Sequence, residues 1–216
     1  IRKNKGSLDM IIPTVMYSKK KDADWHNETE MSNLTTDKHE YTADDNFTTY
    51  DGSEMTGSSY DYYIDLLNDT IPQKIVLKVG SQVMLKANLD SENGLVNGSR
   101  GIVIELSENI VTVKFKLVGD VRIQRYSWEI EDEYVYIKRT QFPLILSWAC
   151  TIHKGQGSTL DYAVCDLGPS IFTTGQAYVA LSRVRNIDSL YIIEFSPYSI
   201  KVDEEALEYN QSLSKH

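Results

Sequence analysis

A series of short apolar runs constrains the fold of this chain more than any other feature. The runs alternate apolar and polar residues and recur at a spacing of roughly 8 to 12 residues, which is typical of small antiparallel β-barrels. Turn signals such as Asn97-Gly98 and Gly119-Asp120 separate them. The expected strands are Ile75–Val79, Gln82–Lys86, Gly101–Leu106, Ile110–Phe115, Val121–Tyr126 and Tyr134–Arg139.

The chain on either side of these runs alternates strand and helix patterns. An apolar run at 10–17 predicts a buried strand, and Pro13 within it predicts a sheet edge or a bulge. Helix-forming residues at 22–34 predict a helix that Asp22 or Asp24 caps. Such alternation predicts an α/β domain. The later expected elements are a strand or helix through Trp148, a Gly-rich loop, a strand at 162–167, a helix at 174–184, a strand at 190–195 and a terminal helix at 203–213.

The simplest architecture that joins these patterns is an α/β domain interrupted by a small β-barrel. Residues 1–88 and 141–216 would form the α/β domain, and residues 89–140 would form the inserted barrel. Thr, Ser, Gly, Asp and Tyr recur with little period from residue 46 towards residue 72. That composition predicts a mobile acidic loop in 46–72.

Composition limits the classes of protein that the chain can belong to. Its 216 residues, 41% of them hydrophobic, suffice for one sizeable domain with a small insert. A formal charge of −9 excludes a generic basic nucleic-acid coat protein. The sequence shows neither an apolar run long enough to span a membrane nor a secretory leader. We therefore expect a soluble, intracellular protein that does not bind membranes and, because it starts at Ile1 with a strand close behind, a piece of a larger protein.

The cysteine and histidine residues suggest no metal site. Cys150 and Cys165, with four histidines at unrelated spacings, form neither a zinc signature nor a disulfide framework. We expect two reduced, mostly buried thiols.

The charge is unevenly distributed along the chain. Residues 1–70 hold 7 basic and 14 acidic groups, whereas residues 71–162 hold 11 and 10, and residues 163–216 hold 4 and 7. The basic residues of the middle part could follow a phosphate backbone. Half-buried strands with Lys and Arg on their solvated face would give the same composition.

One Gly-rich segment, C-T-I-H-K-G-Q-G-S-T at 150–159, carries polar chemistry. It is not a Walker A loop, because its lysine precedes both glycines instead of following the second. Gly155 and Gly157 permit a tight turn that approaches a flat or charged ligand closely. His153, Lys154 and Gln156 would bring donors to that ligand. An ordinary Gly-rich loop with polar neighbours is the alternative interpretation.

A second segment, G-Q-A-Y-V-A-L-S-R-V-R at 175–185, predicts a helix with Arg183 at its far end. The planar donors of an arginine held there can meet a phosphate, as an arginine finger does. A surface arginine that the helix dipole favours at the C-terminus would have the same spacing.

The two segments in this order resemble the fifth and sixth conserved motifs of superfamily-one DNA helicases, most closely the Pif-one type. The run I-I-P-T-V-M-Y-S, followed by Asn27, is similar to the fourth motif of that family. Two further runs, L-K-V-G-S-Q-V-M-L-K-A-N and G-L-V-N-G-S-R-G, resemble the stretch that leads into its barrel insert, and P-L-I-L-S-W-A-C resembles the return to the core. The resemblance covers residues 10–196 and leaves 46–72 and the terminal helix unmatched.

The resemblance implies a second RecA-like domain interrupted by a Src-homology-3-like barrel. In the family, ATP lies between two RecA-like domains, and the first of them carries the Walker A lysine and the carboxylates for Mg²⁺. This chain would lack that half, so it would neither hydrolyse ATP nor unwind DNA alone. The implied ligands and partners of the full protein are ATP, Mg²⁺, single-stranded and forked DNA, and its own N-terminal RecA-like domain. It would travel 5′-to-3′ wherever DNA is replicated or repaired, in a nucleus, a mitochondrion or a viral replication site.

The resemblance also implies roles for individual residues. Arg183 would be the catalytic arginine finger, and it would contact ATP together with Gly155, Gln156 and Gly157. The implied DNA contacts are Thr14, Asn27, Asn97, Thr151, His153 and Lys154. Independently of the resemblance, the interleaved charged and aromatic residues of the barrel suggest phosphate contacts or aromatic stacking through Lys114, Lys116, Arg122, Arg125, Tyr126 and Trp128. Val15 departs from the family, which often has a basic residue there, and Lys19 or Lys20 is a weaker substitute.

Two other functions remain open from the sequence. A non-catalytic module could bind a protein or nucleic acid through an aromatic groove on the barrel, with no role for Arg183. The motor of a RecD-like or helicase-primase complex would share the motifs but have other partners.

Overall fold

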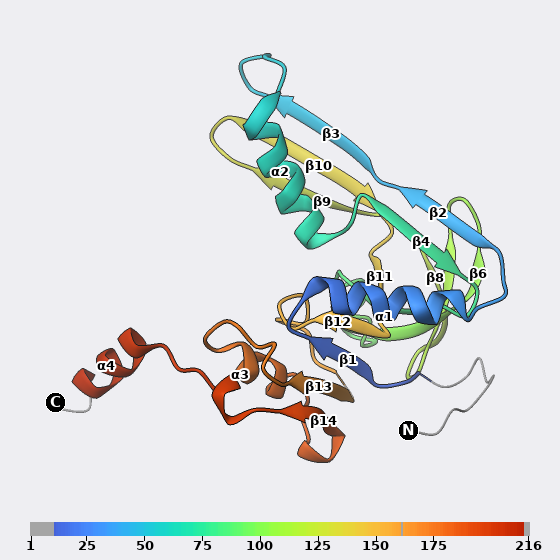
Figure 1. The fold of residues 1–216 in the computed structure, drawn as a ribbon. Coiled ribbons are helices and arrows are strands. Elements are labelled where there is room, and N and C mark those ends of the chain that lie inside the picture. The colour runs from blue at the N-terminus through green and yellow to red at the C-terminus, as the bar shows by residue number, and fades with distance from the viewer. Residues whose placement is uncertain (1–10, 161, 214–216) are drawn as a thin grey trace. The chain divides into compact units, whose positions relative to one another are not determined.

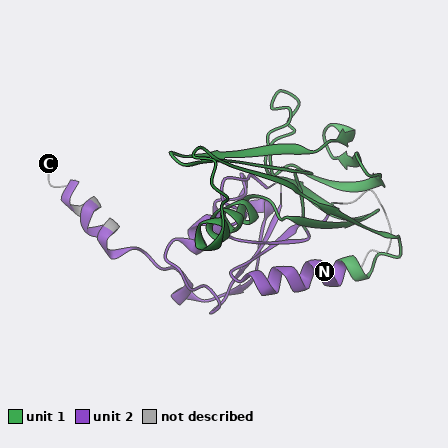
Figure 2. Cartoon of the chain, turned by 90° about the horizontal axis from the view of Figure 1, so that it is seen from above, with its two compact units in different colours: residues 1–11, 31–147 green, residues 12–30, 148–216 purple. Residues whose placement is uncertain are grey.

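The structure is a computed structural model that describes residues 11–160 and 162–213. The described chain divides into two compact units, shown in Figure 2. Unit 1 contains residues 11 and 31–147, and unit 2 contains residues 12–30 and 148–213.

Unit 2 is built on a four-stranded parallel sheet with the order β12-β1-β13-β14 (Figure 1). Its strands are β12 (Ala149–Thr151), β1 (Thr14–Tyr17), β13 (Ala163–Leu167) and β14 (Leu190–Phe195). The expectation that Pro13 marks an edge strand or a bulge was wrong, because β1 lies between two neighbours. Pro13 precedes the strand's first paired residue, so its missing N–H removes no ladder bond. Residue 10 of the expected strand lies outside the described residues.

Helices of unit 2 occur where the sequence predicted them, but the helix expected at 22–34 begins at Lys20 with Asp22 inside its first turn, so the expectation that Asp22 or Asp24 caps it was wrong. They are α3 (Gln176–Leu181), α4 (Glu204–Leu213), the short 3₁₀ turns Ile187–Ser189 and Pro197–Ser199, and residues 20–30 of α1 (Lys20–Ser32). Met16, Leu167 and Ala180 are fully buried in this unit. Cys150 and Cys165 are free and buried, and burial raises the pKa of the Cys165 thiol to about 11.

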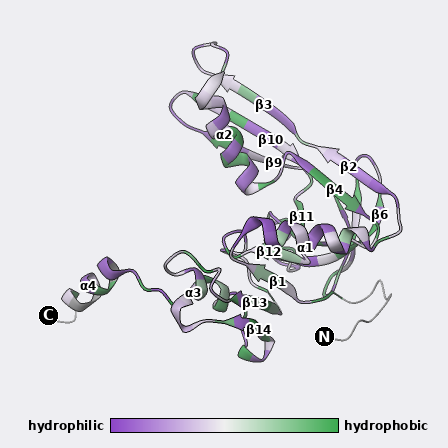
Figure 3. Cartoon of the chain, viewed as in Figure 1, coloured by the Kyte–Doolittle hydropathy of each residue, from purple (hydrophilic) through white to green (hydrophobic). Residues whose placement is uncertain are grey.

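Unit 1 contains three antiparallel sheets. The largest has the order β11-β5-β6-β7-β8 and buries Val83, Val103, Val113 and Leu144 completely. A two-stranded sheet pairs β2 with β4, and the apolar residues of β4 stand out in Figure 3. A three-stranded sheet has the order β3-β10-β9. Closure of these strands into a Src-homology-3-like barrel stays a prediction. The strand bounds are β2 (Lys38–Thr42), β3 (Asp44–Thr49), β4 (Lys74–Lys78), β5 (Gln82–Leu85), β6 (Arg100–Leu106), β7 (Val111–Phe115), β8 (Gly119–Ile123), β9 (Tyr126–Glu131), β10 (Val135–Gln141) and β11 (Leu144–Leu146).

The segment expected to be a mobile acidic loop, 46–72, is folded. It contributes most of β3 and the whole of helix α2 (Gly57–Thr70). Leu67 of α2 is buried in a cluster with Val135 and Ile137 of β10. Packing from distant parts of the chain therefore orders a sequence whose local propensities are weak.

The compact units divide at 30/31 and 147/148, whereas the sequence suggested boundaries at 88 and 141. The difference arises because β5 pairs with both β6 and β11, so these strands share one sheet across the expected boundaries. The assignment of 1–88 and 141–216 to a RecA-like domain, and of 89–140 to its insert, remains a prediction. In the part of the chain that the structure describes, no helix has the length and apolar character needed to cross a membrane.

Candidate functional site

Residues 152–158, here called the motif loop, follow the carboxyl end of β12. In open α/β sheets, ligands bind at the carboxyl ends of the strands. The loop is closed by its own backbone, with Gly155 N donating to Thr151 O at 3.0 Å and Ser158 N donating to Gly155 O at 3.1 Å. It is therefore a defined turn at the edge of the sheet where a ligand is expected.

The two glycines of the motif loop meet different structural requirements: Gly155 has no room for a side chain, and Gly157 has a positive φ. A Cβ atom on buried Gly155 would lie 2.6 Å from the Cε atom of Met16, a side chain that is itself fully buried. Gly157 has a φ of +78°, in the left-handed region that glycine tolerates. Gln156 and Gly157 are exposed, so they are the accessible members of the predicted nucleotide-binding set.

Arg183 lies directly after the cap residue of α3 and is hydrogen-bonded to the motif loop. Its Nη1 donates to Ser158 O at 3.3 Å, its Nε to Val179 O at 2.8 Å, and its Nη2 to Ser182 Oγ at 2.8 Å. Its carbonyl oxygen accepts from Leu160 N at 2.8 Å. Among the described residues these bonds use three of the five N–H donors of a guanidinium, so Arg183 can donate to a further group.

Gln176 is a positioning residue that the sequence analysis missed. It is 3% exposed at the start of α3, where its Nε2 donates to Ser18 O at 3.4 Å and its Oε1 accepts from Phe172 N at 3.3 Å. These contacts fix the start of α3 to the end of β1 and to the segment after β13. The residue stands in the second helicase-like segment, but its type and spacing do not indicate that it is buried.

The three predicted DNA contacts at and after β12 differ in accessibility. Thr151 is buried and its Oγ1 accepts from Lys154 N at 3.2 Å, while Lys154 is half-buried. His153 is exposed, and its ring lies 6.3 Å from the ring of Phe172, which is 57% exposed. His153 and Phe172 thus present neighbouring rings to solvent beside the motif loop.

Thr14 and Asn27 are engaged inside unit 2. Thr14 is fully buried at the start of β1. The side-chain amide of Asn27 donates from Nδ2 to Ala149 O and accepts at Oδ1 from Ala149 N, both at 2.9 Å. This pair of bonds, here called the Asn27 clasp, fixes α1 to the edge strand β12 in the way a neighbouring strand would. The structure therefore places Asn27 where it positions the strand that leads into the motif loop.

Replacement of Asn27 by alanine is expected to lower the free energy of unfolding by about 1–3 kcal/mol, because the buried Ala149 N–H and C=O lose their partners. Urea denaturation measures this loss. Glu28→Ala, at the next and exposed position, is the matched control. Equal stability of the two variants would show that the clasp contributes nothing.

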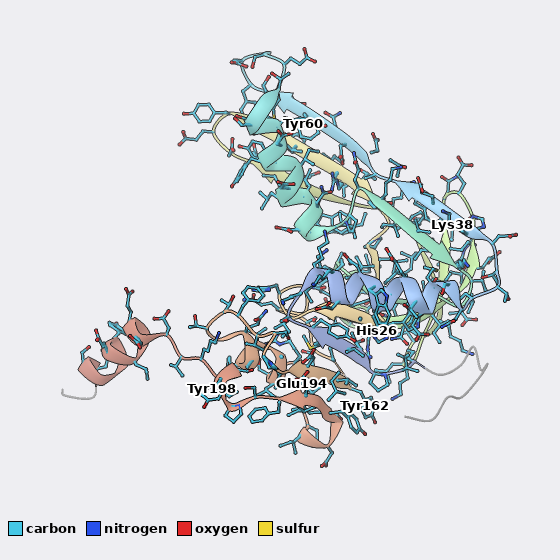
Figure 4. All side chains as sticks on the ribbon, viewed as in Figure 1. His26, Lys38, Tyr60, Tyr162, Glu194 and Tyr198 are labelled. Carbon is cyan, nitrogen blue, oxygen red and sulfur yellow. The ribbon has the colours of Figure 1, made fainter. Side chains whose placement is uncertain are left out.

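A second contact joins α1 to β1. The Tyr17 hydroxyl lies 3.1 Å from Nδ1 of His26, which Figure 4 labels on α1. Burial raises the pKa of Tyr17, and the charges of Asp166 and Asp22 add to that effect. Burial lowers the pKa of His26, and the charge of Glu30 opposes this. Both rings are therefore neutral at pH 7.

The remaining predicted contacts lie in unit 1. Asn97 is half-buried, with its N–H donating to Asn88 Oδ1 at 2.8 Å, and its own Oδ1 is buried with no hydrogen-bond partner among the described residues. Arg125 is structural, because its Nη1 donates to Thr42 O at 2.9 Å and its guanidinium lies 5.1 Å from the ring of Phe142. The exposed basic side chains of this predicted set are Lys114, Lys116 and Arg122.

The predicted stacking residues of unit 1 contact each other. Tyr126 and Trp128 of β9 have ring centroids 4.9 Å apart in an edge-to-face arrangement. Trp128 packs against the core of unit 1, and Tyr126 is 39% exposed. Of the two rings, that of Tyr126 is the more available to a ligand.

Comparison with known proteins shows which proteins this chain resembles. A family model described as "DNA helicase Pif1, 2B domain" matches residues 66–106. The "ATP-dependent DNA helicase PIF1" of Xenopus laevis is 35% identical over 98% of this chain and 32% of its own length. The chain thus spans about a third of the length of the curated relatives that it matches.

Solved structures of Pif1 helicases match nearly the whole chain. The Pif1 helicase of Candida albicans has a TM-score of 0.71 and 30% identity, with 94% of this chain and 50% of that chain covered. A Bacteroides Pif1 helicase in complex with ADP-AlF3 and single-stranded DNA has a TM-score of 0.64 and 28% identity, with 100% and 48% covered. Together, these matches show that the chain is similar over nearly its whole length to the C-terminal part of Pif1 DNA helicases.

Proposed function

We propose that this chain is the part of an ATP-dependent DNA helicase that couples the state of the nucleotide to the grip on DNA. The observation that carries the proposal is the hydrogen bond from Arg183 Nη1 to Ser158 O. It connects the predicted arginine finger to the loop that carries His153 and Lys154. A shift of Arg183 towards a phosphate would therefore act directly on residues that are suited to hold a DNA strand.

The residues predicted to contact the nucleotide have donors that fit a phosphate ligand. Arg183 retains donors, Gln156 is exposed, and the motif loop offers the amide of Gly157 next to it. No Walker A pattern occurs in the 216 residues, and no group of three or more metal-ligating side chains occurs among the described ones. We therefore assign Mg²⁺ and most of the ATP contacts to an N-terminal RecA-like domain of the longer protein.

The residues on the DNA side fit a single strand. Lys154 and His153 supply donors to phosphates, and the exposed ring of Phe172 beside His153 offers a stacking surface for a base. Thr14, Thr151 and Asn27 would act by holding the strands that carry this loop. In unit 1, Asn97, Lys114, Lys116 and Arg122 are the candidates for further contacts, and Arg125 holds Thr42 O and the ring of Phe142.

The proposed cycle follows from the predicted nucleotide contacts and the predicted DNA contacts. Closure of the two RecA-like domains on ATP brings Arg183 to the γ-phosphate, and hydrolysis removes that connection. The full helicase would step 5′-to-3′ along single-stranded DNA and open forked duplexes. It would work wherever DNA is replicated or repaired.

Experiments on the isolated 216-residue chain test the proposal that most ATP contacts lie in another domain and that this chain contacts DNA. It is expected to show no Mg²⁺-dependent ATP hydrolysis and to bind a single-stranded oligonucleotide weakly. Its affinity is expected to fall steeply as the salt concentration rises from roughly 50 to 200 mM, because phosphate contacts release counterions. Fluorescence anisotropy measures the affinity, and a coupled assay measures hydrolysis.

Lys154→Ala is expected to reduce the salt dependence of this binding, and Lys38→Ala, an exposed lysine on β2, is the matched control. Salt-independent binding would contradict the DNA contacts. ATP hydrolysis by the isolated chain that Arg183→Ala abolishes would contradict the assignment of the ATP site to two halves.

A further inference from the structure

Strand β14 ends the parallel sheet of unit 2 and exposes apolar side chains on both of its faces. It pairs with β13 along one edge, and its other edge is unpaired within the described residues. The exposed side chains continue past the strand to Tyr198, labelled in Figure 4. We call the following set the β14 strip: Tyr191 (53% exposed), Ile192 (46%), Ile193 (53%), Phe195 (54%), Tyr198 (88%) and Ile200 (50%).

The neighbouring strand shows that the sheet is covered unevenly beside the β14 strip. Helix α3 covers one face of β13, where Cys165 is fully buried and its Sγ lies 3.9 Å from Ala180 O. On the opposite face, Val164 is half-buried and pairs in register with Tyr191, which is more than half exposed. The sheet is therefore closed on the α3 side and uncovered at its β14 end.

An exposed apolar strand with a free edge is a site of association. The composition of the strip indicates the kind of partner. Glu194 is the one charged residue in 190–200, and the segment contains no Lys or Arg. The strip itself offers a nucleic acid no cation, and the next residue, Lys201, directs its Nζ to Ile171 O and Phe172 O, whereas an apolar helix or strand would bury aromatic and aliphatic surface.

We propose that the β14 strip is the docking surface for a segment of the same helicase polypeptide that lies outside these 216 residues. This inference rests on the proposed function, in which the chain is part of a longer helicase. The chain covers 32% of the Xenopus relative and 50% of the Candida structure, so much polypeptide is available to cover the strip. A tethered segment has an effective concentration in the millimolar range, which favours it over a second copy of the chain.

Hydrogen exchange, followed by mass spectrometry, tests the proposal on two proteins, the isolated chain and a polypeptide of the relatives' length that contains it. Peptides from residues 190–200 are expected to exchange at least tenfold more slowly in the longer polypeptide. Peptides from β13 are expected to exchange alike in both. Equal exchange of 190–200 in both proteins, with both monomeric, would overturn the proposal.

A charge placed on the strip gives a second, independent measurement. Ile193→Glu is expected to leave the melting temperature of the isolated chain unchanged and to lower that of the longer polypeptide by several degrees. Leu117→Glu, at an 86% exposed position in unit 1, is the control and should change neither. If instead Ile193→Glu only dissolves a dimer that both proteins form, the occupant is a second copy and the proposal is wrong. Neither readout requires ATP hydrolysis or unwinding, so the docking surface and the proposed function can fail separately.

Discussion

Replacement of Arg183 by alanine in the longer helicase polypeptide is expected to slow ATP hydrolysis by roughly 10³-fold or more, the range measured for arginine fingers. The guanidinium would stabilise charge that develops on the γ-phosphate only in the transition state. The loss should therefore fall on kcat, with little change in KM. Arg183→Lys should not restore the rate, because an ammonium group lacks the planar fork of donors.

Arg185→Ala is the matched control for this experiment, since Arg185 is an exposed arginine two positions further along the chain. Arg183 also donates to Val179 O and Ser158 O, so thermal melting must accompany the kinetics. Loss of those exposed or half-buried contacts is expected to cost about 1 kcal/mol. A variant that melts normally and hydrolyses ATP at the wild-type rate would remove Arg183 from the mechanism.

Replacement of Arg139 by leucine is expected to lower the free energy of unfolding by about 3–5 kcal/mol, which is the cost of breaking a buried ion pair from one side. The Arg139 side chain is 0% exposed, and its Nε and Nη2 each donate to a carboxylate oxygen of Asp45 at 2.7 Å. Its Nη1 also donates to Asn68 Oδ1 at 2.8 Å and to Ile71 O at 2.9 Å. The substitution removes the donor from both carboxylate oxygens of Asp45 and from Ile71 O, while Asn68 Oδ1 keeps the hydrogen bond from Gln73 N at 3.3 Å.

Chemical denaturation monitored by circular dichroism measures this loss. Lys138→Ala is the control, because Lys138 is 42% exposed and its Nζ lies 3.7 Å from Glu129 Oε1, a surface pair expected to contribute less than about 1 kcal/mol. The double variant Arg139→Leu, Asp45→Leu is expected to recover part of the stability, since it leaves no buried carboxylate. A double variant that is less stable than Arg139→Leu alone would contradict this account.

The sequence predicted most strands where apolar residues alternate or run together, but it missed β9 and extended the strand expected at 121–126 past the end of β8 at Ile123. The run Leu190–Phe195 is an example, because it is a strand in the structure over the same residues. Local pattern failed for β3 and α2, whose Thr-, Ser- and Asp-rich sequences have low propensity. Their order depends on contacts such as Arg139 to Asp45, which lie 94 residues apart and leave no periodic signal.

The sequence indicated some residues of the candidate site but not the hydrogen bonds that hold them in place. The roles of the motif loop and Arg183 stay predictions, and they rest on residue types that resemble the motifs of one helicase family. The hydrogen bonds of Gln176 and of the Asn27 clasp could not be predicted from the sequence, since both side chains bond to backbone atoms of distant segments. Asn27 and Ala149 are 122 residues apart, and no side-chain pattern at 149 identifies that partner.

The Asn27 clasp also bears on how the chain came to contain two units. Unit 1 leaves unit 2 after residue 30 and returns at residue 148, and the clasp holds Asn27 and Ala149, close to these two points, within hydrogen-bonding distance. A long insertion between two adjacent points adds little loop-closure entropy, since that cost grows only with the logarithm of loop length. The parallel sheet could therefore have acquired, exchanged or enlarged unit 1 during evolution without rebuilding its own core.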